Sequence, residues 1–391
     1  MPSVIKDTFK GKIPPPPAER GPLWEGPAGA GPNGGVTQSL ISRWLSCRER
    51  FRLHAIEGLC PAERFRHALE YGRMWHVCEE ALAGIHRDAT VGGKWKAAVE
   101  WALTQHAEAL VQKFPLQREE IEHWASVCAT QFPLYVAHWE AHPDVVNRWP
   151  LLQEHVFDVV YPLPSGRQVR LRGRWDSVDL VGKGGAAGVW LMENKTKGDI
   201  REGQLRRQLG SGFDLQTLTY LVALREWKEQ GGKGVPTNLL CKLGGVRYNV
   251  IRRPLSGGKG SIVRHKATKK NPAGESFDAF YARLGGIITS SPNDFFYRWQ
   301  VVVTPQDILR FRAECLNPVL EQLCQWWEWM QTDALGTPAT PFASGSGIHW
   351  RTPYGMHSRV QEGGEDDLDE HLKTGSMVGL RRADRLFEEL E

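Results

Sequence analysis

The feature that most constrains the fold is a succession of three strand-like runs between Leu151 and Thr196. The runs are LLQEHVFDVVYPL, RQVRLRGRWDSVDLV and GVWLMENKT, and segments rich in Pro, Ser or Gly separate them. Runs of apolar and β-branched residues bounded by such turn residues are typical of β-strands. This part of the chain therefore predicts three consecutive strands of a sheet.

The third run ends in a charged tripeptide, which carries the functional prediction. Side chains alternate along a strand, so Glu193 and Lys195 share a face while Asn194 points away. If the Gly-rich segment before this run is a hairpin loop, Asp176 lies directly across from Glu193. Cross-strand neighbours have Cβ atoms about 4.5–5.5 Å apart, and two bare carboxylates at that distance repel each other. A divalent cation between them removes the repulsion.

The ligand chemistry indicates which cation this would be. Oxygen ligands without a thiolate or a histidine cluster suit magnesium or manganese. Such a metal polarises a phosphoryl oxygen and acidifies a bound water, and Lys195 can orient that water or stabilise charge on the phosphate. The residues therefore predict a metal-dependent phosphodiesterase site. The competing interpretation is a surface ion pair of Glu193 with Lys195 and an ordinary solvent-facing aspartate.

Changes in composition and in the spacing of apolar residues along the sequence predict four regions. Residues 1–36 are rich in Pro and Gly and predict a disordered arm, because they contain too little apolar surface to offset chain entropy. Residues 37–150 show helical spacing and predict an N-terminal helical region. Residues 151–335 hold the predicted core, with a basic loop at 255–275, and residues 336–391 form a turn-rich C-terminal tail.

Composition predicts a cytoplasmic protein with no membrane partner. No run approaches the roughly 18 apolar residues of a membrane span, and the N-terminus lacks the apolar segment of a signal peptide. Seven scattered cysteines are typical of reduced thiols. The net charge is only +4, so local basic clusters indicate more about a polyanionic partner than the total charge does.

Several motifs resemble, in order, those of one nuclease family. GRWDSVDL followed by VWLMENKTKG is similar to the G-x-x-D and E-x-K pair of the PD-(D/E)xK superfamily, and DLQTLTYLVAL to the Q-x-x-x-Y helix of its RecB-like exonuclease branch. SLISRWLSCRERFRLHAIEGL, YGRMWHVCEEAL and LLQEHVFDVVY resemble that branch's N-terminal helix, its G-x-x-x-H helix and the strand before G-x-x-D. The resemblance covers about residues 37–255. It implies an α/β, restriction-endonuclease-like fold, a mixed central sheet flanked by helices with an N-terminal helical subregion.

The resemblance implies a role for each matching residue. Asp176 and Glu193 would be catalytic metal ligands, and Lys195 would be the catalytic lysine. The main-chain carbonyl of Asn194 and the side chain of His76 would be further metal ligands. The competing interpretation of His76 is an ordinary core or capping histidine.

A pair of helix residues and an acidic strand residue complete the resemblance. Gln216 and Tyr220 are four residues apart and share a helix face, which the resemblance places beside the scissile end of a nucleic acid. An amide and a phenol suit contacts to phosphate or sugar, which carry no sequence code. The alternative is a packing pair inside the fold. Glu154 takes the acidic position of the strand before G-x-x-D.

Basic residues predict where a nucleic-acid backbone would lie. Arg172 and Arg174 share the face of Asp176 along their strand, and Lys197 follows the active strand. The basic loop at 255–275 is a second candidate contact. For both groups, a simple solvated surface is the competing interpretation.

The function implied is a magnesium- or manganese-dependent DNA exonuclease of phage or bacterial recombination, repair or replication. Its location would be the host cytoplasm if a phage encodes it, and its partners would be DNA and a single-strand annealing protein or helicase in a separate chain. The alternatives are a structure-specific DNA endonuclease and a nucleic-acid-binding protein with a vestigial site. The intact Asp176, Glu193 and Lys195 argue against a vestigial site.

Many members of the RecB-like branch hold an iron–sulfur cluster through one cysteine in the N-terminal helix and three near the C-terminus. Cys47 falls where the first cysteine would be, but residues 343–360 contain no cysteine. Four thiolate ligands cannot be assembled, so we expect no iron–sulfur cluster.

Overall fold

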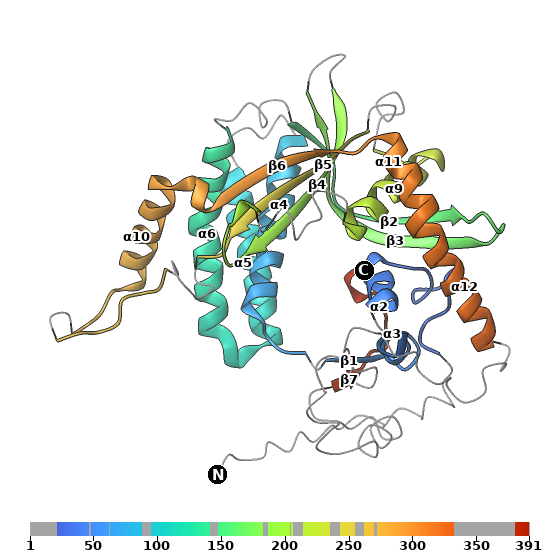
Figure 1. The fold of residues 1–391 in the computed structure, drawn as a ribbon. Helices are drawn as coiled ribbons and strands as arrows, with labels where there is room; N and C mark the ends of the chain where they lie inside the picture. The colour runs from blue at the N-terminus through green and yellow to red at the C-terminus, as the bar shows by residue number, and fades with distance from the viewer. Residues whose placement is uncertain are drawn as a thin grey trace, which may run out of the picture. The chain divides into compact units, whose positions relative to one another are not determined.

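The computed structural model contains two compact units (Figure 1). The first unit consists of Met1–Glu63, Pro162–Arg170 and Asn317–Glu391, and the second of Arg64–Tyr161 and Leu171–Leu316. The residues that the structure describes are 22–46, 48–61, 63–87, 95–140, 148–182, 187–203, 205, 214–234, 243–254, 262–269, 272–331 and 380–390.

A five-stranded mixed sheet is the centre of the second unit. Its strands, in spatial order, are β2 (Arg148–Pro162), β3 (Gln168–Val181), β4 (Gly188–Lys197), β5 (Leu243–Arg252) and β6 (Phe296–Val302). β4 runs antiparallel to β3 and parallel to β5, and β5 runs antiparallel to β6. A parallel pair needs a crossover connection, and α9 (Leu215–Glu229) lies between β4 and β5 in the chain.

The register of β3 against β4 is the one that the sequence predicts. The ladder runs from Val181 opposite Gly188 to Ser177 opposite Met192. Continued by one residue, the same register sets Asp176 against Glu193. The loop between these strands, residues 183–186, lies outside the described residues.

Three long helices pack together beside the sheet: α4 (His67–Arg87), α5 (Trp95–Lys113) and α6 (Arg118–Glu140). α10 (Phe277–Ser290) packs on α6, as Figure 1 shows. Apolar side chains of these helices form one buried cluster with Ile251 of β5 and Phe296 of β6. The cluster is rich in aromatic rings, which bury a large apolar area per residue and hold α4 against the sheet.

After β6, the chain continues into α11 (Pro305–Phe311) and a π-helical turn, Arg312–Leu316. Thr304 and Asp307 form a capping box at the start of α11, and Pro305 stands in the first turn, where its missing N–H leaves no bond unmade. The N-terminal end of the helix is therefore set by local sequence.

The first unit has its own small core. It contains α2 (Gln38–Ser46), α3 (Arg48–Ala55), α12 (Asn317–Gln331) and the antiparallel strands β1 (Leu59–Pro61) and β7 (Leu380–Arg382). Trp24 lies in the segment that composition predicts to be disordered, yet its side chain is fully buried. Its ring packs edge-on against Phe51 and Trp327, and its Nε1 donates to the carbonyl of Gly35 at 2.8 Å. The large aromatic ring of Trp24 supplies apolar burial in a stretch whose composition predicts little of it.

The α/β fold predicted from the sequence is confirmed: a mixed sheet flanked by helices, with helices preceding it in the chain. No helix among the described residues is long and apolar enough to cross a membrane.

Candidate active site

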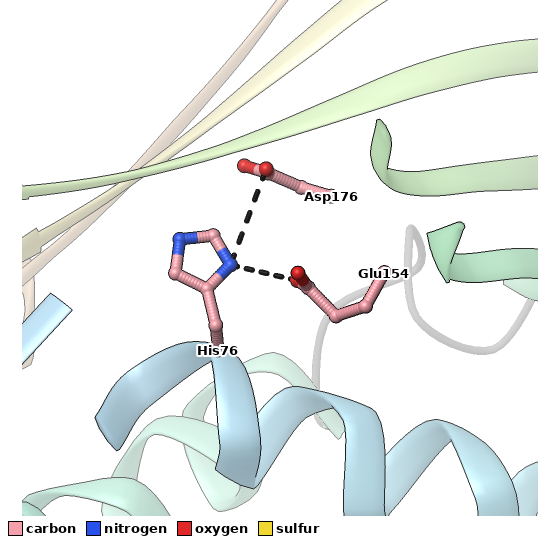
Figure 2. Close-up of side chains that lie close together, drawn as sticks. All are labelled: His76, Glu154 and Asp176. Atoms are coloured by element: carbon pink, nitrogen blue, oxygen red, sulfur yellow. Dashed lines mark hydrogen bonds and ion pairs between the residues drawn. The ribbon is translucent and has the colours of Figure 1, made fainter. Parts of the chain in front are cut away.

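Three side chains from three different elements converge at one point of the second unit. Figure 2 shows His76 of α4 facing Glu154 of β2 and Asp176 of β3. The Nδ1 atom of His76 lies 2.7 Å from Glu154 Oε1 and 4.0 Å from Asp176 Oδ1. One ligand atom from each residue falls within 4.8 Å of the others, which is the spacing of a group that can hold a metal ion.

The backbone at Glu154 is unusual. Its φ is +44°, and it is the only non-glycine residue with a positive φ among the described residues. L-residues reach this region at a cost of roughly 1–2 kcal/mol, and such conformations cluster at functional sites. Here the conformation accompanies a carboxylate that is directed at His76, with only 11% of its side chain exposed.

A second group of polar side chains surrounds Glu193. The Nζ atom of Lys195 donates to Glu193 Oε2 at 2.8 Å and approaches the Gln216 amide oxygen at 3.3 Å. The amide nitrogen of Gln216 donates to the same Glu193 oxygen at 3.3 Å. Strand alternation therefore brings Glu193 and Lys195 to one face of β4, as predicted, and α9 supplies the third member.

The main chain of β4 connects the two groups. The backbone N–H of Asn194 donates to Asp176 Oδ2 at 2.7 Å. Asp176 thus faces His76 with one carboxylate oxygen and is fixed by β4 with the other. The group around His76 and the group around Glu193 therefore form one continuous site.

Burial and charge shift the titration of these groups. Burial lowers the pKa of His76, but Asp176 and Glu154 outweigh it and raise the pKa to about 9. Burial raises the pKa of Glu193 to about 7, against the opposing effect of the Lys195 ammonium. Burial also disfavours the charge on Lys195, yet Glu193 and Asp176 outweigh it and raise the pKa of that ammonium. Lys195 is therefore a cation, suited to donate hydrogen bonds and not to accept a proton.

A network of buried polar side chains holds the side chain of Asn194 through hydrogen bonds. Asn249 of β5, the cross-strand neighbour of Asn194, donates to its Oδ1 at 2.7 Å. The same amide nitrogen of Asn249 donates to the hydroxyl of Tyr135 on α6 at 2.8 Å. Tyr135 donates to Glu79 Oε1 at 2.5 Å and accepts from Arg298 at 3.0 Å. Glu79 stands one turn after His76 on α4, so this network links β4 to the helix that carries His76.

Side-chain hydrogen bonds also fix the N-terminal end of α9. Asp214 caps the helix by accepting from the N–H of Thr217 at 3.1 Å. The Tyr248 hydroxyl hydrogen-bonds both the Asp214 carboxylate and the Thr217 hydroxyl. This fixes the first turn of α9 and with it the position of Gln216.

A model of the PD-(D/E)XK nuclease superfamily matches residues 36–314, a span that holds every residue of the site. The chain belongs to the PD-(D/E)XK nuclease superfamily. No curated protein sequence is significantly similar to it. Membership places the chain among metal-dependent nucleases.

The site fits the divalent cation that PD-(D/E)XK nucleases use. Oε1 of Glu193 is fully buried and has no hydrogen-bond partner among the described residues. A buried carboxylate oxygen without a donor is costly, and a bound cation would satisfy it. The three-residue group contains Glu154 beside His76 and Asp176, whereas Glu193 lies outside this group and contacts Lys195 and Gln216.

The structure also places the remaining predicted contact residues of this PD-(D/E)XK nuclease. Tyr220 is partly buried, and its ring lies edge-on to Phe157, with centroids 5.4 Å apart. Arg172 approaches Asp158 at 3.5 Å, and Arg174 lies 4.0 Å from Glu154 with 39% of its side chain exposed. Burial and the neighbouring Lys195 lower the pKa of Lys197.

Sequence reasoning did not find the supporting residues Tyr135, Asn249 and Glu79. Tyr135 and Asn249 stand within apolar segments and Glu79 stands beside Glu80, and nothing in the spacing indicates that the three meet. Asp214 carried a recognisable signal, because an aspartate immediately before an apolar helical run is a typical N-cap.

Proposed function

We propose that the chain is a magnesium-dependent DNA exonuclease that hydrolyses phosphodiester bonds. The observation that carries the proposal is the convergence of His76, Glu154 and Asp176 beside the bonded trio of Glu193, Lys195 and Gln216. Carboxylates with one imidazole form a hard ligand set that suits magnesium or manganese. The order of motifs, which resembles the RecB-like branch, supports DNA ends as the substrate and DNA recombination, repair or replication as the setting.

The residues divide into two roles in this proposal. His76, Glu154, Asp176 and Glu193 would hold the cation, which supplies polarisation of a phosphoryl oxygen and acidification of a bound water when it is present. Lys195, held by Glu193 and Gln216, donates hydrogen bonds to the attacking water or to the phosphate. Its fixed position matters because electrostatic stabilisation depends on donors that are already oriented before the reaction.

The metal assignment is tested by replacing one carboxylate at a time. Asp176→Ala and Glu193→Ala should each reduce the cleavage rate by roughly 10³-fold, because loss of several kcal/mol of transition-state stabilisation has this effect. The fold should persist, since each change also relieves repulsion between carboxylates. Asp199→Ala is the matched control, because this exposed aspartate pairs with Arg201 outside the site. Either site variant, folded and with wild-type turnover, would refute the assignment.

The preference for DNA ends is tested on the face of α9. Gln216→Ala and Tyr220→Phe remove groups that are not ligands for magnesium, so calorimetry should show unchanged metal affinity. Misplacement of a reacting group by about 1 Å can reduce a rate on the order of 100-fold, so cleavage of linear DNA should fall steeply. Cleavage of nicked circular DNA should fall much less. Equal cleavage of linear DNA by the variants and the wild type would favour a structure-specific endonuclease.

A further inference from the structure

A basic segment of the second unit, between β5 and α10 in the chain, projects beyond α6 and α10 (Figure 1). We call residues 262–269 and 272–275 the basic arm. The N–H of Ile262 donates to the carbonyl of Pro254 at 3.0 Å, which ties the first leg of the arm to the end of β5. The second leg ends at Ser276, which caps α10.

The base of the arm is clamped by one carboxylate. Arg283 of α10 donates to both oxygens of Glu275, at 2.7 and 2.8 Å, and to the carbonyl of Val263 at 2.9 Å. The second leg is bonded to the first through the Glu275 N–H and the His265 carbonyl at 3.0 Å. Charge-assisted bidentate pairs of this kind are the strong ones among surface contacts. The arm therefore has a defined conformation at its base.

The two legs approach each other closely at Gly274. Its φ is +70°, and a Cβ there would lie 3.0 Å from the backbone nitrogen of Ala267. The guanidinium carbon of Arg264 lies 4.2 Å from the centre of the Phe277 ring. Close backbone contact and ring stacking hold the arm as a narrow projection.

The arm presents positive charge without compensating acid. Arg264, Lys266 and Lys269 are all exposed, and residues 262–269 contain no Asp or Glu. Within the described part of the chain, neither lysine ammonium forms an ion pair. Glu275 does not neutralise them, because Arg283 occupies both of its oxygens. Like charges gathered on a narrow projection repel one another unless a polyanion binds there.

We infer that the basic arm binds the phosphate backbone of nucleic acid away from the residues that cleave it. The inference rests on the proposed function, because it assigns a second contact region to the same substrate. Lysines at this position would make contacts to phosphate without sequence preference. The arm would add affinity for long substrates and leave the chemistry of the site unchanged.

The test compares Lys266→Ala/Lys269→Ala with a control that removes the same charge elsewhere, Lys96→Ala/Lys233→Ala, both exposed lysines of the second unit. Binding of a fluorescent 40-base-pair duplex and of one of its strands is measured by anisotropy over a range of salt, with EDTA present to prevent cleavage. The slope of log affinity against log salt should decrease by about 1.8 for the duplex, at about 0.9 per phosphate contact, or by about 1.4 for the single strand. The control should keep the wild-type slope.

An unchanged slope in the arm variant on both substrates, or an equal decrease in the control, would overturn the inference. Cleavage of DNA by the wild type in magnesium tests the proposed function separately. If the wild type cleaves DNA and the Lys266→Ala/Lys269→Ala variant keeps the wild-type salt slope, only the inference about the arm is refuted. Glu275→Ala tests the clamp. Net charge alone predicts tighter DNA binding after loss of this acid, whereas an arm held in place by Glu275 predicts weaker DNA binding. Tighter or unchanged DNA binding would contradict the role of the clamp.

Discussion

The buried hydroxyl of Tyr135 is expected to stabilise the protein far more than a typical surface hydrogen bond does. Tyr135→Phe removes one oxygen and leaves the ring, which is almost fully buried, in place. The oxygen donates to Glu79 at 2.5 Å and accepts from Asn249 at 2.8 Å and Arg298 at 3.0 Å. All three partners belong to the polar network next to the residues proposed to hold the metal.

The loss of unfolding free energy in Tyr135→Phe depends on which hydrogen bonds each partner of the hydroxyl keeps. Arg298 retains the amide oxygen of Asn249 and its position over the Trp139 ring, and Asn249 retains its bond to Asn194. Glu79, only 2% exposed, loses a donor. A hydrogen bond to a charged group contributes about 1.5–3 kcal/mol and a neutral one about 1 kcal/mol. The variant should therefore lose about 3 kcal/mol of unfolding free energy, or roughly 10 °C in midpoint temperature.

The assay is urea denaturation followed by fluorescence, with Tyr281→Phe as the matched control. The Tyr281 hydroxyl contacts His123 at 2.8 Å in a partly exposed position, so its removal should cost about 1 kcal/mol or less. Equal unfolding free energies for the two variants would refute the reasoning.

Three further predictions concern packing, pH and metal. Gly173→Ala should destabilise the protein by about 1–3 kcal/mol in thermal denaturation, because its Cβ would lie 2.5 Å from the Phe157 ring, whereas Gly286→Ala, with nothing within 4 Å, should be neutral or stabilising. Hydrogen bonding by Arg283 lowers the pKa of Glu275 to about 2, so the ion pair at the base of the arm is complete above about pH 4.5 and is lost as pH falls towards 2. The protection factors of the arm's amides, which compare the measured exchange rate with the intrinsic rate at the same pH, should fall over that interval. Protection factors that stay constant from pH 4.5 to pH 2 would contradict this prediction. EDTA should abolish cleavage and added magnesium should restore it; cleavage that persists without divalent cations would exclude a metal-dependent site.

The sequence by itself determined the parts of the site that depend on neighbours along the chain. Alternation along one strand placed Glu193 and Lys195 together, and a short antiparallel connection set the register that leads to Asp176. These relations follow from the two-residue period of a strand and from the length of the loop, which are both local. The first three strands of the sheet could be predicted for the same reason, whereas the edge strand β6 was not predicted.

Only the tertiary structure decided which distant polar residues meet. His76, Glu154 and Asp176 come from a helix and two strands, and the Tyr135–Asn249 contact joins residues 114 positions apart. Composition also predicts no order around Trp24, whose buried ring packs edge-on against Trp327 of α12, about 300 residues further along the chain. Hydrophobic periodicity indicates which face of an element is buried and carries no information about its partner. The pairing of buried polar groups depends on how whole elements pack, because each such group must find its hydrogen bonds wherever packing places it.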